Sequence, residues 1–202
     1  MARVEPRKST LARVADWYCR RNYGRSIETT GVLAHNPWNL IGYGTLEYGT
    51  EHSHKLNERL KLLAATKSAT QVGCQFCIDI GTALGRDAGV TDDQIRDFHS
   101  YMESAAFSEE EKLVIEYAEQ MTNTPVNISE ELFGRLREHF DEAQIVELTA
   151  AIAIENLRAR FNNALDIPPA GFSEGKSCPL PDHVAAAASN GAETAQPGRT
   201  IA

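Results

Sequence analysis

Residues 60–89 read LKLLAATKSATQVGCQFCIDIGTALGRDAG, and this stretch says more about the fold than any other part of the chain. Its leucines recur at helical spacing, Gly73 then interrupts the helix, and a second segment with apolar periodicity follows. Cys74 and Cys77 stand directly after the glycine. The stretch therefore predicts two consecutive helices, with a Cys-x-x-Cys pair at the start of the second.

The spacing of the two cysteines suits redox chemistry. Positions i and i+3 lie on one face of a helix, close enough for a disulfide. The start of a helix also favours the thiolate, which can attack a peroxide oxygen to give a sulfenic acid. The second thiol then condenses to the disulfide, and an external thiol reduces it. Helix position alone favours Cys74 as the nucleophile, because it lies nearer the helix start.

Other interpretations of the cysteines stay open. The pair can be buried and inert, or can hold zinc with His52 and His54, although that spacing fits no standard zinc motif. We predict no metal and no cofactor. Cys19 lies beside Trp17 and is expected to pack in the interior. Cys178 follows Ser177 in a predicted coil, where a role as a third redox thiol is an alternative.

Composition limits the class of protein. The chain has 202 residues, 42% of them hydrophobic and 24% charged, which is typical of one globular domain. Its net charge of -8 argues against a nucleic-acid surface. No apolar run reaches the roughly 20 residues of a membrane span, and the N-terminus lacks a secretory apolar segment. We expect a cytoplasmic protein, and in that reducing compartment a close cysteine pair more often indicates redox chemistry or a metal than a structural disulfide.

The remaining periodicity is helical, and we predict an all-α domain over residues 9–170. Residues 1–8 are expected to form a flexible arm, and residues 24–31 a connector. Residues 171–202 are expected to form coil and then a flexible, disordered tail rich in small residues. Capping signals and apolar spacing predict helices over residues 9–22, from residue 37 onward, and over 55–72, 74–88, 92–101, 109–121, 129–139 and 141–165.

The last of these helices is apolar on nearly all sides over residues 145–154, a pattern expected of a central helix or of one at a subunit interface. It therefore favours a homo-oligomer. Glu155 interrupts the apolar run, and a carboxylate there needs a partner if it is buried. Arg158, three residues later, is the simplest one.

Three motifs together resemble the carboxymuconolactone decarboxylase / alkylhydroperoxidase D family: residues 60–89, the segment NLRARFNNALDI at 156–167, and His35-Asn36-Pro37. The resemblance implies an alkylhydroperoxidase D-like helical bundle that assembles into homo-oligomers. It implies an antioxidant peroxidase or thiol-disulfide oxidoreductase acting on a peroxide or a disulfide, with a thiol protein or small thiol as electron donor. It also implies that Cys77 attacks the peroxide and Cys74 resolves the sulfenic acid.

The chain departs from the family at its proton relay. Family peroxidases carry a glutamate twelve residues before the first cysteine, a histidine just before the second, and another four residues after it; here these positions are Leu62, Phe76 and Gly81. A peroxidase needs an acid or base for the leaving oxygen. The substitutes that we considered are Glu155, Glu58 and Asp79.

The missing relay keeps two other functions open. A lactone decarboxylase of the same family has no need of the cysteine pair. A redox sensor or an oligomeric helical module, without catalysis, has no need of the relay.

Overall fold

The computed structural model describes residues 2–179 and 181; the predictions for residue 180 and for 182–202 lie outside the described residues. The described chain is helical and contains no strand, which confirms the predicted all-α class. None of its helices is long and apolar enough to cross a membrane. The α-helices are α1 (Thr10–Tyr23), α2 (Glu28–Leu33), α3 (Pro37–Glu51), α4 (Glu58–Val72), α5 (Gln75–Asp87), α6 (Asp92–Arg96), α7 (Glu109–Thr122), α8 (Glu130–His139) and α9 (Glu142–Ala164), with a short 3-10 turn at Phe98–Ser100.

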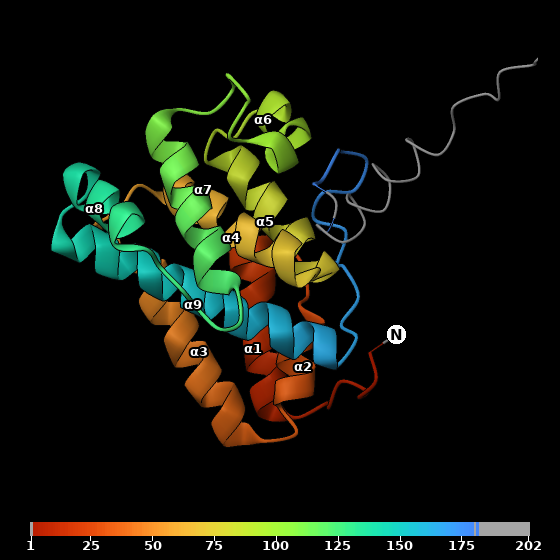
Figure 1. Ribbon diagram of the computed structural model, residues 1–202. Helices are drawn as coiled ribbons and strands as arrows, with labels where there is room; N and C mark the ends of the chain where they lie inside the picture. The colour runs from red at the N-terminus through yellow and green to blue at the C-terminus, as the bar shows by residue number, and fades with distance from the viewer. Residues whose placement is uncertain (1, 180, 182–202) are drawn as a thin grey trace, which may run out of the picture.

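Helix α4 lies at the centre and packs against α5, α7 and α9. The long α9 crosses the molecule, with α1, α2 and α3 on one side of it and α4 to α7 on the other (Figure 1). The main core lies between α4, α7, α8 and α9, where Leu63, Ile115, Leu136 and Leu148 are fully buried. Burying one such side chain stabilises the folded state by about 1.5–3 kcal/mol relative to leaving it exposed.

A second core cluster surrounds the cysteine pair. It joins α2, α4, α5 and the end of α9 through Val32, Ala69, Ile78 and Ala159, among others. Cys74 and Cys77 belong to this cluster. The fold thus places the pair in the interior, at the junction between the central helices and the N-terminal ones.

The predicted helix boundaries follow from local chemistry. Gly73 ends α4 in the left-handed region at φ 79°, where a side chain would strain the backbone. Asn57 caps the start of α4, so this helix begins three residues later than the spacing of its leucines predicted. Asn36 and Pro37 open α3 as predicted.

The N-terminal region contains a helix that the sequence analysis did not predict. The expected connector 24–31 contains the start of α2, which lacks a side-chain cap and buries Thr29 and Val32. Tertiary packing therefore supports a helix that its local sequence hides. The arm, predicted as flexible, bonds through the Arg3 amide to the Leu165 carbonyl (2.8 Å) and through the Arg7 amide to the Gly31 carbonyl (2.9 Å).

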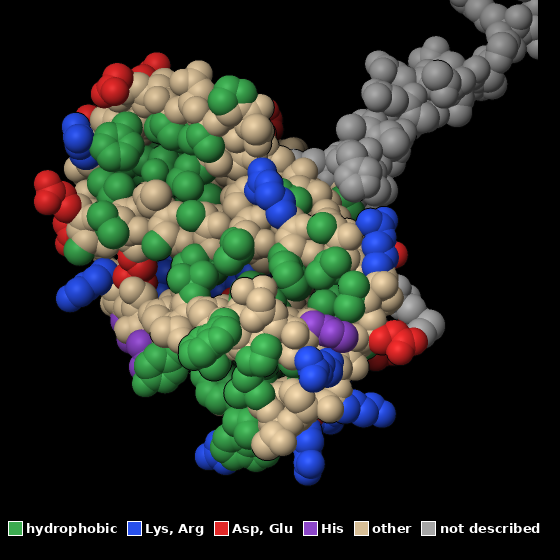
Figure 2. All heavy atoms as spheres, turned by 90° about the horizontal axis from the view of Figure 1, so that it is seen from below, with side chains coloured by type: hydrophobic (Ala, Val, Ile, Leu, Met, Phe, Trp, Pro, Cys, Tyr) green, Lys and Arg blue, Asp and Glu red, His purple; other side chains and the backbone are tan. Residues whose placement is uncertain are grey.

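The predicted all-round burial of residues 145–154 holds only in part, because Val146 is 67% exposed. Leu157, further along α9, and Trp38 and Ile41 on α3 are exposed as well. Several groups of apolar side chains are visible on the face shown in Figure 2. The homo-oligomer stays a prediction, and these side chains are the surface that a second copy would cover.

Asp79 secures the segment that follows α9. Its carboxylate accepts hydrogen bonds from the backbone amides of Phe172 (2.9 Å) and Ser173 (2.7 Å). The Ser173 hydroxyl donates in turn to the Asp79 carbonyl at 2.8 Å. The first residues of the predicted coil are therefore fastened to α5.

Replacing Asp79 by Ala should release this segment, because two backbone amides lose a charged acceptor, at a cost of about 2 kcal/mol. Trypsin should then cut after Lys176 at least several-fold faster in the folded protein, measured by mass spectrometry. Asp87→Ala, at an exposed position on the same helix, is the matched control and should leave the cleavage rate unchanged. Equal cleavage rates in the two variants would contradict the role given to Asp79.

Candidate active site

The cysteine pair sits at the turn between α4 and α5. Cys74 is the N-cap of α5, and its sulfur accepts the backbone N–H of Cys77 at 3.2 Å. The two residues form a disulfide across one helical turn, with a Cα–Cα distance of 5.3 Å. Cys74 is 1% exposed and Cys77 is 4% exposed. The predicted pairing on one turn is therefore confirmed.

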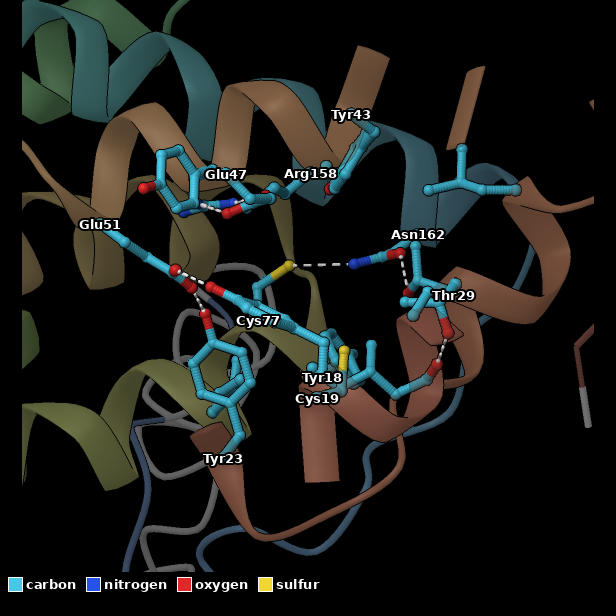
Figure 3. A pocket seen from close by; sticks show the side chains of 18 of the residues that line it. Tyr18, Cys19, Tyr23, Thr29, Tyr43, Glu47, Glu51, Cys77, Arg158 and Asn162 are labelled. Carbon is cyan, nitrogen blue, oxygen red and sulfur yellow. Dashed lines mark hydrogen bonds and ion pairs between the residues drawn. The ribbon is translucent and has the colours of Figure 1, made fainter. Parts of the chain in front are cut away.

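A large apolar pocket lies beside Cys77. Its volume is about 670 Å³, within the range of small-molecule sites. Residues from α1, α2, α3, α4, α5 and α9 line it, and Figure 3 shows their side chains converging. Cys77 is among the lining residues and Cys74 is not. A molecule in the pocket therefore reaches one sulfur of the pair, while the other lies behind it.

The sulfur of Cys77 has one polar neighbour. The amide nitrogen of Asn162 lies 3.5 Å from it and can donate to it. The Thr29 hydroxyl donates to the Asn162 oxygen at 2.9 Å, and this bond fixes the amide with its NH₂ group toward the sulfur (Figure 3). Both polar side chains are buried. They form a preorganised donor that stabilises negative charge on Cys77 in its reduced state.

A cluster of charged side chains joins α9 to α3 at the pocket. The Arg158 guanidinium binds both carboxylate oxygens of Glu47, with Nε at 2.7 Å from Oε1. Its Nη1 also lies 3.2 Å from Oε2 of Glu155. The other Glu155 oxygen, Oε1, is buried without a hydrogen-bond partner. All three residues line the pocket.

Burial raises the pKa of Glu155 to about 7, against the opposing influence of Arg158, which lowers it. The side chain is 6% exposed, so its ionised form gains little from water. A carboxyl group with this pKa is partly protonated at neutral pH. Glu155 can therefore give or take a proton at the wall of the pocket under ordinary conditions.

A second acidic group lies at the end of α3. Glu51 accepts hydrogen bonds from the phenols of Tyr18 and Tyr23, both on α1 (Figure 3). The bond to Glu51 raises the pKa of Tyr18 to about 12. Burial, and then the bond to Glu51, raises the pKa of Tyr23 as well. Both phenols stay neutral and act as donors to the carboxylate.

The three positions at which the chain lacks a family relay residue, Leu62, Phe76 and Gly81, all line this pocket. The fold thus keeps these positions beside Cys77 but fills them with apolar residues. The acidic side chains at the pocket, Glu47, Glu51 and Glu155, come instead from α3 and α9.

Of the three predicted substitutes, only Glu155 lies at the pocket. Glu58 is 60% exposed at its side chain and pairs with Lys61 at 2.8 Å. Asp79 is occupied by the backbone of Phe172 and Ser173. The structure therefore brings neither of these two acids to the cysteine pair.

Sequence reasoning missed Glu47, Glu51, Tyr23 and Asn162. One signal was available: Glu47 and Glu51 are the only charged residues of α3, and they stand four positions apart, on one face of the helix. That pattern indicates an inward-facing acidic stripe on an otherwise neutral helix. Their partners on α1 and α9 are distant in sequence and gave no signal.

The other cysteines are placed as follows. Cys19 is buried at the pocket wall, and burial raises the pKa of its thiol to about 11, so it stays protonated. Cys178 is half-buried and packs against the cluster that contains the cysteine pair. His52, considered as a zinc ligand, bonds to the Tyr48 carbonyl at 2.8 Å. Among the described residues no three His, Cys, Asp or Glu side chains gather into a metal site.

Comparison with known proteins identifies the family. The sequence model of the carboxymuconolactone decarboxylase family matches residues 41–120. The uncharacterised protein YnjA of Escherichia coli K12 is 31% identical over 173 residues, which covers 85% of this chain and 92% of YnjA. The chain belongs to the carboxymuconolactone decarboxylase family.

Solved structures agree with the fold. The debrominase Bmp8 superposes with a TM-score of 0.74 at 20% identity, over 84% of this chain and 92% of Bmp8. The alkylhydroperoxidase AhpD core of a peroxidase-related protein from Ralstonia eutropha JMP134 superposes with a TM-score of 0.73 at 16% identity. The match covers 83% of this chain and 92% of that protein. The predicted alkylhydroperoxidase D-like bundle is confirmed. At these identities the likeness concerns the fold alone.

The raised pKa of Glu155 predicts a pH-dependent stability. The folded protein holds the proton to about pH 7, whereas the unfolded chain releases it near 4.5. The folded state therefore binds more protons over this window, and the free energy of unfolding contributed by Glu155 falls as the pH rises.

Glu155→Gln removes this contribution. Its unfolding free energy relative to the parent, measured by urea denaturation at pH 5, 6 and 7, should rise with pH by up to about 1.4 kcal/mol per unit. Glu58→Gln, at an exposed position, should differ from the parent by a constant amount. A constant difference for Glu155→Gln would show that Glu155 has an ordinary pKa.

Proposed function

We propose that this chain is a thiol-dependent peroxidase in which Cys77 attacks the peroxide and Cys74 resolves the product. One observation carries the proposal: Cys77 lines a ligand-sized pocket, and its partner sulfur lies one helical turn behind it. Substrate and resolving thiol thus approach Cys77 from different sides. Family membership supports a redox enzyme of the alkylhydroperoxidase D type.

In the first step the Cys77 thiolate attacks the terminal oxygen of a hydroperoxide. The S–O bond forms as the O–O bond breaks, which gives the sulfenic acid and an alkoxide. The alkoxide takes its proton from Glu155 and leaves as the alcohol. The Asn162 amide, which donates toward the sulfur at 3.5 Å, favours the thiolate that begins the step.

In the second step the Cys74 thiol attacks the sulfur of the sulfenic acid. The S–S bond forms, the S–O bond breaks, and hydroxide leaves as water with the thiol proton. Because the two Cα atoms are already 5.3 Å apart, this step requires no large movement of the backbone. A thiol protein or small thiol then reduces the disulfide by exchange and supplies two electrons and two protons.

Glu155 is the acid that this proposal places where the family relay is missing. It is the residue at the pocket whose pKa, about 7, matches a proton carrier at neutral pH. Arg158 holds one of its oxygens, and the other is buried without a hydrogen-bond partner. General acid catalysis of this kind contributes about 10²–10⁴-fold to a rate.

A second candidate is reductive dehalogenation of a small aromatic ring. The debrominase Bmp8 shares the fold, and a Bmp8 variant has been solved with 2,3,4-tribromopyrrole. The apolar pocket favours such a substrate. The Cys77 thiolate would take the halogen, the ring carbon would take the proton of Glu155, and Cys74 would expel halide as the disulfide forms. Release of halide, rather than alcohol, distinguishes this reaction.

Cysteine variants test the proposal. Cys77→Ser should abolish reduction of cumene hydroperoxide in the presence of dithiothreitol, because the attacking sulfur is gone. Cys74→Ser should consume one peroxide per chain and accumulate a sulfenic acid, detected by dimedone labelling and mass spectrometry. Cys178→Ser, at a cysteine that does not line the pocket, is the control and should retain the rate.

Three outcomes would contradict the proposal. A sulfenic acid on Cys74 would reverse the assigned roles. Lactone decarboxylation that survives loss of both cysteines would favour the lyase branch of the family. Oxidation of the pair without turnover would favour a redox sensor.

A further inference from the structure

The pocket beside Cys77 has a charge pattern that specifies its ligand. We propose that it binds a neutral aromatic compound carrying an O–H or N–H donor, and that it rejects carboxylates and other anions. This inference names the substrate class of the proposed enzyme. It rests on the proposed function only where the ligand is said to be the substrate, because binding itself needs no redox step.

The size and walls of the pocket fit an aromatic ring system. A volume of about 670 Å³ is far more than hydrogen peroxide needs and suits a molecule of two fused rings. Aromatic side chains of Tyr18, Tyr43 and Phe76 line it, together with aliphatic ones such as Leu62 and Ile80. Rings gain from offset or edge contacts with such walls as well as from burial.

The charges at the pocket are already matched with one another. Arg158 is the guanidinium there, and its donors bind Glu47 and Glu155. Glu51 is occupied by the phenols of Tyr18 and Tyr23. An incoming carboxylate would lose its water shell, find no free cation, and lie near three acidic side chains. A neutral ligand meets none of these costs.

Glu51 has spare capacity as an acceptor, while the guanidinium of the pocket and the two phenols at Glu51 are occupied. Each oxygen of Glu51 accepts one phenol and has a further lone pair. The phenols of Tyr18 and Tyr23 and the guanidinium of Arg158 already donate within the protein. A ligand that is to bond to Glu51 must therefore supply the hydrogen itself, as a phenol, an alcohol, a hydroperoxide or a ring N–H does.

Four probes on the same ring test the proposal by calorimetry at pH 6.5. They are 2-naphthol, 2-methoxynaphthalene, 2-naphthoate and 2-(aminomethyl)naphthalene, which are respectively a neutral donor, a neutral compound without a donor, an anion and a cation. The protein is the full chain with Cys74→Ser and Cys77→Ser, which removes all redox chemistry of the pair.

2-Naphthol should bind most tightly. 2-Methoxynaphthalene should bind about 5- to 10-fold more weakly, the value of one hydrogen bond. The naphthoate should bind at least roughly 100-fold more weakly, because its charge is left unpaired. The ammonium probe should also bind more weakly than naphthol, because the cost of taking its charge out of water into a largely apolar pocket exceeds the gain from a hydrogen bond to Glu51.

Glu51→Gln locates the site. It removes one negative charge from the pocket and should bring the naphthoate affinity at least several-fold closer to that of naphthol. Glu119→Gln is the matched control, since Glu119 also accepts a tyrosine phenol, that of Tyr101 at 2.8 Å, and does not line this pocket. It should leave all four affinities unchanged.

The inference is overturned if naphthoate or the ammonium probe binds as tightly as naphthol. It is also overturned if naphthol fails to bind, or if Glu51→Gln and Glu119→Gln behave alike. These results are independent of the peroxidase assay. Naphthol binding without peroxide turnover would contradict the proposed reaction but not the proposed ligand class. Peroxide turnover without selective binding would contradict the ligand class but not the reaction.

Discussion

The ion pair between Arg158 on α9 and Glu47 on α3 holds the pocket together. Helix α3 has fifteen residues but buries only one, Leu40, so apolar packing contributes little to its position. Its attachment depends on polar contacts: Glu47 with Arg158, and Glu51 with the phenols of Tyr18 and Tyr23. Because these contacts are partly or largely buried, they are worth more than surface pairs, and losing one partner leaves a costly unpaired charge.

The same ion pair sets the chemistry of Glu155. Arg158 shares its guanidinium between two carboxylates, and Glu47 takes the bidentate contact. Glu155 keeps a single contact at 3.2 Å, which is too little to offset its burial, and its pKa stays near 7. If Arg158 were paired with Glu155 alone, that carboxyl would be held ionised and could not donate a proton. The ion pair between Arg158 and Glu47 thus leaves Glu155 with a raised pKa in the pocket that Cys77 also lines.

This arrangement accounts for the apolar residues at the family's relay positions. Leu62, Phe76 and Gly81 enlarge the pocket and make its wall less polar, whereas the acidic side chains of the pocket belong to α3 and α9. The acidic side chains therefore come from other helices than the three apolar residues at the relay positions. A pocket built in this way can hold a bulky neutral ligand and still have a titratable carboxyl group, that of Glu155, in its wall.

Much of the fold could be predicted from local signals. The Gly73 turn, the caps and the apolar periodicity mark the helices, and the Cys-x-x-Cys spacing marks the redox pair. Sequence reasoning missed α2, because its residues are poor helix formers and tertiary burial of Thr29 and Val32 decides the outcome. It also placed Asp79 among the candidate acids, since nothing local shows that the backbone of residues 172 and 173 occupies it. Glu155 was predicted as a candidate because a carboxylate within an apolar run requires an explanation. Glu47, which shares Arg158 with Glu155, could not be predicted, because it lies 111 residues from Arg158 in the sequence.

The central claim is that Glu155 serves as the proton carrier of Cys77. It is tested most directly by the single-turnover rate of sulfenic acid formation in the Cys74→Ser protein, measured against pH with and without Glu155→Gln. The account predicts that the rate falls above about pH 7, where Glu155 loses its proton, and that Glu155→Gln removes this limb and slows the reaction at pH 6 by about 100-fold. Overlapping pH profiles for the two proteins would contradict it.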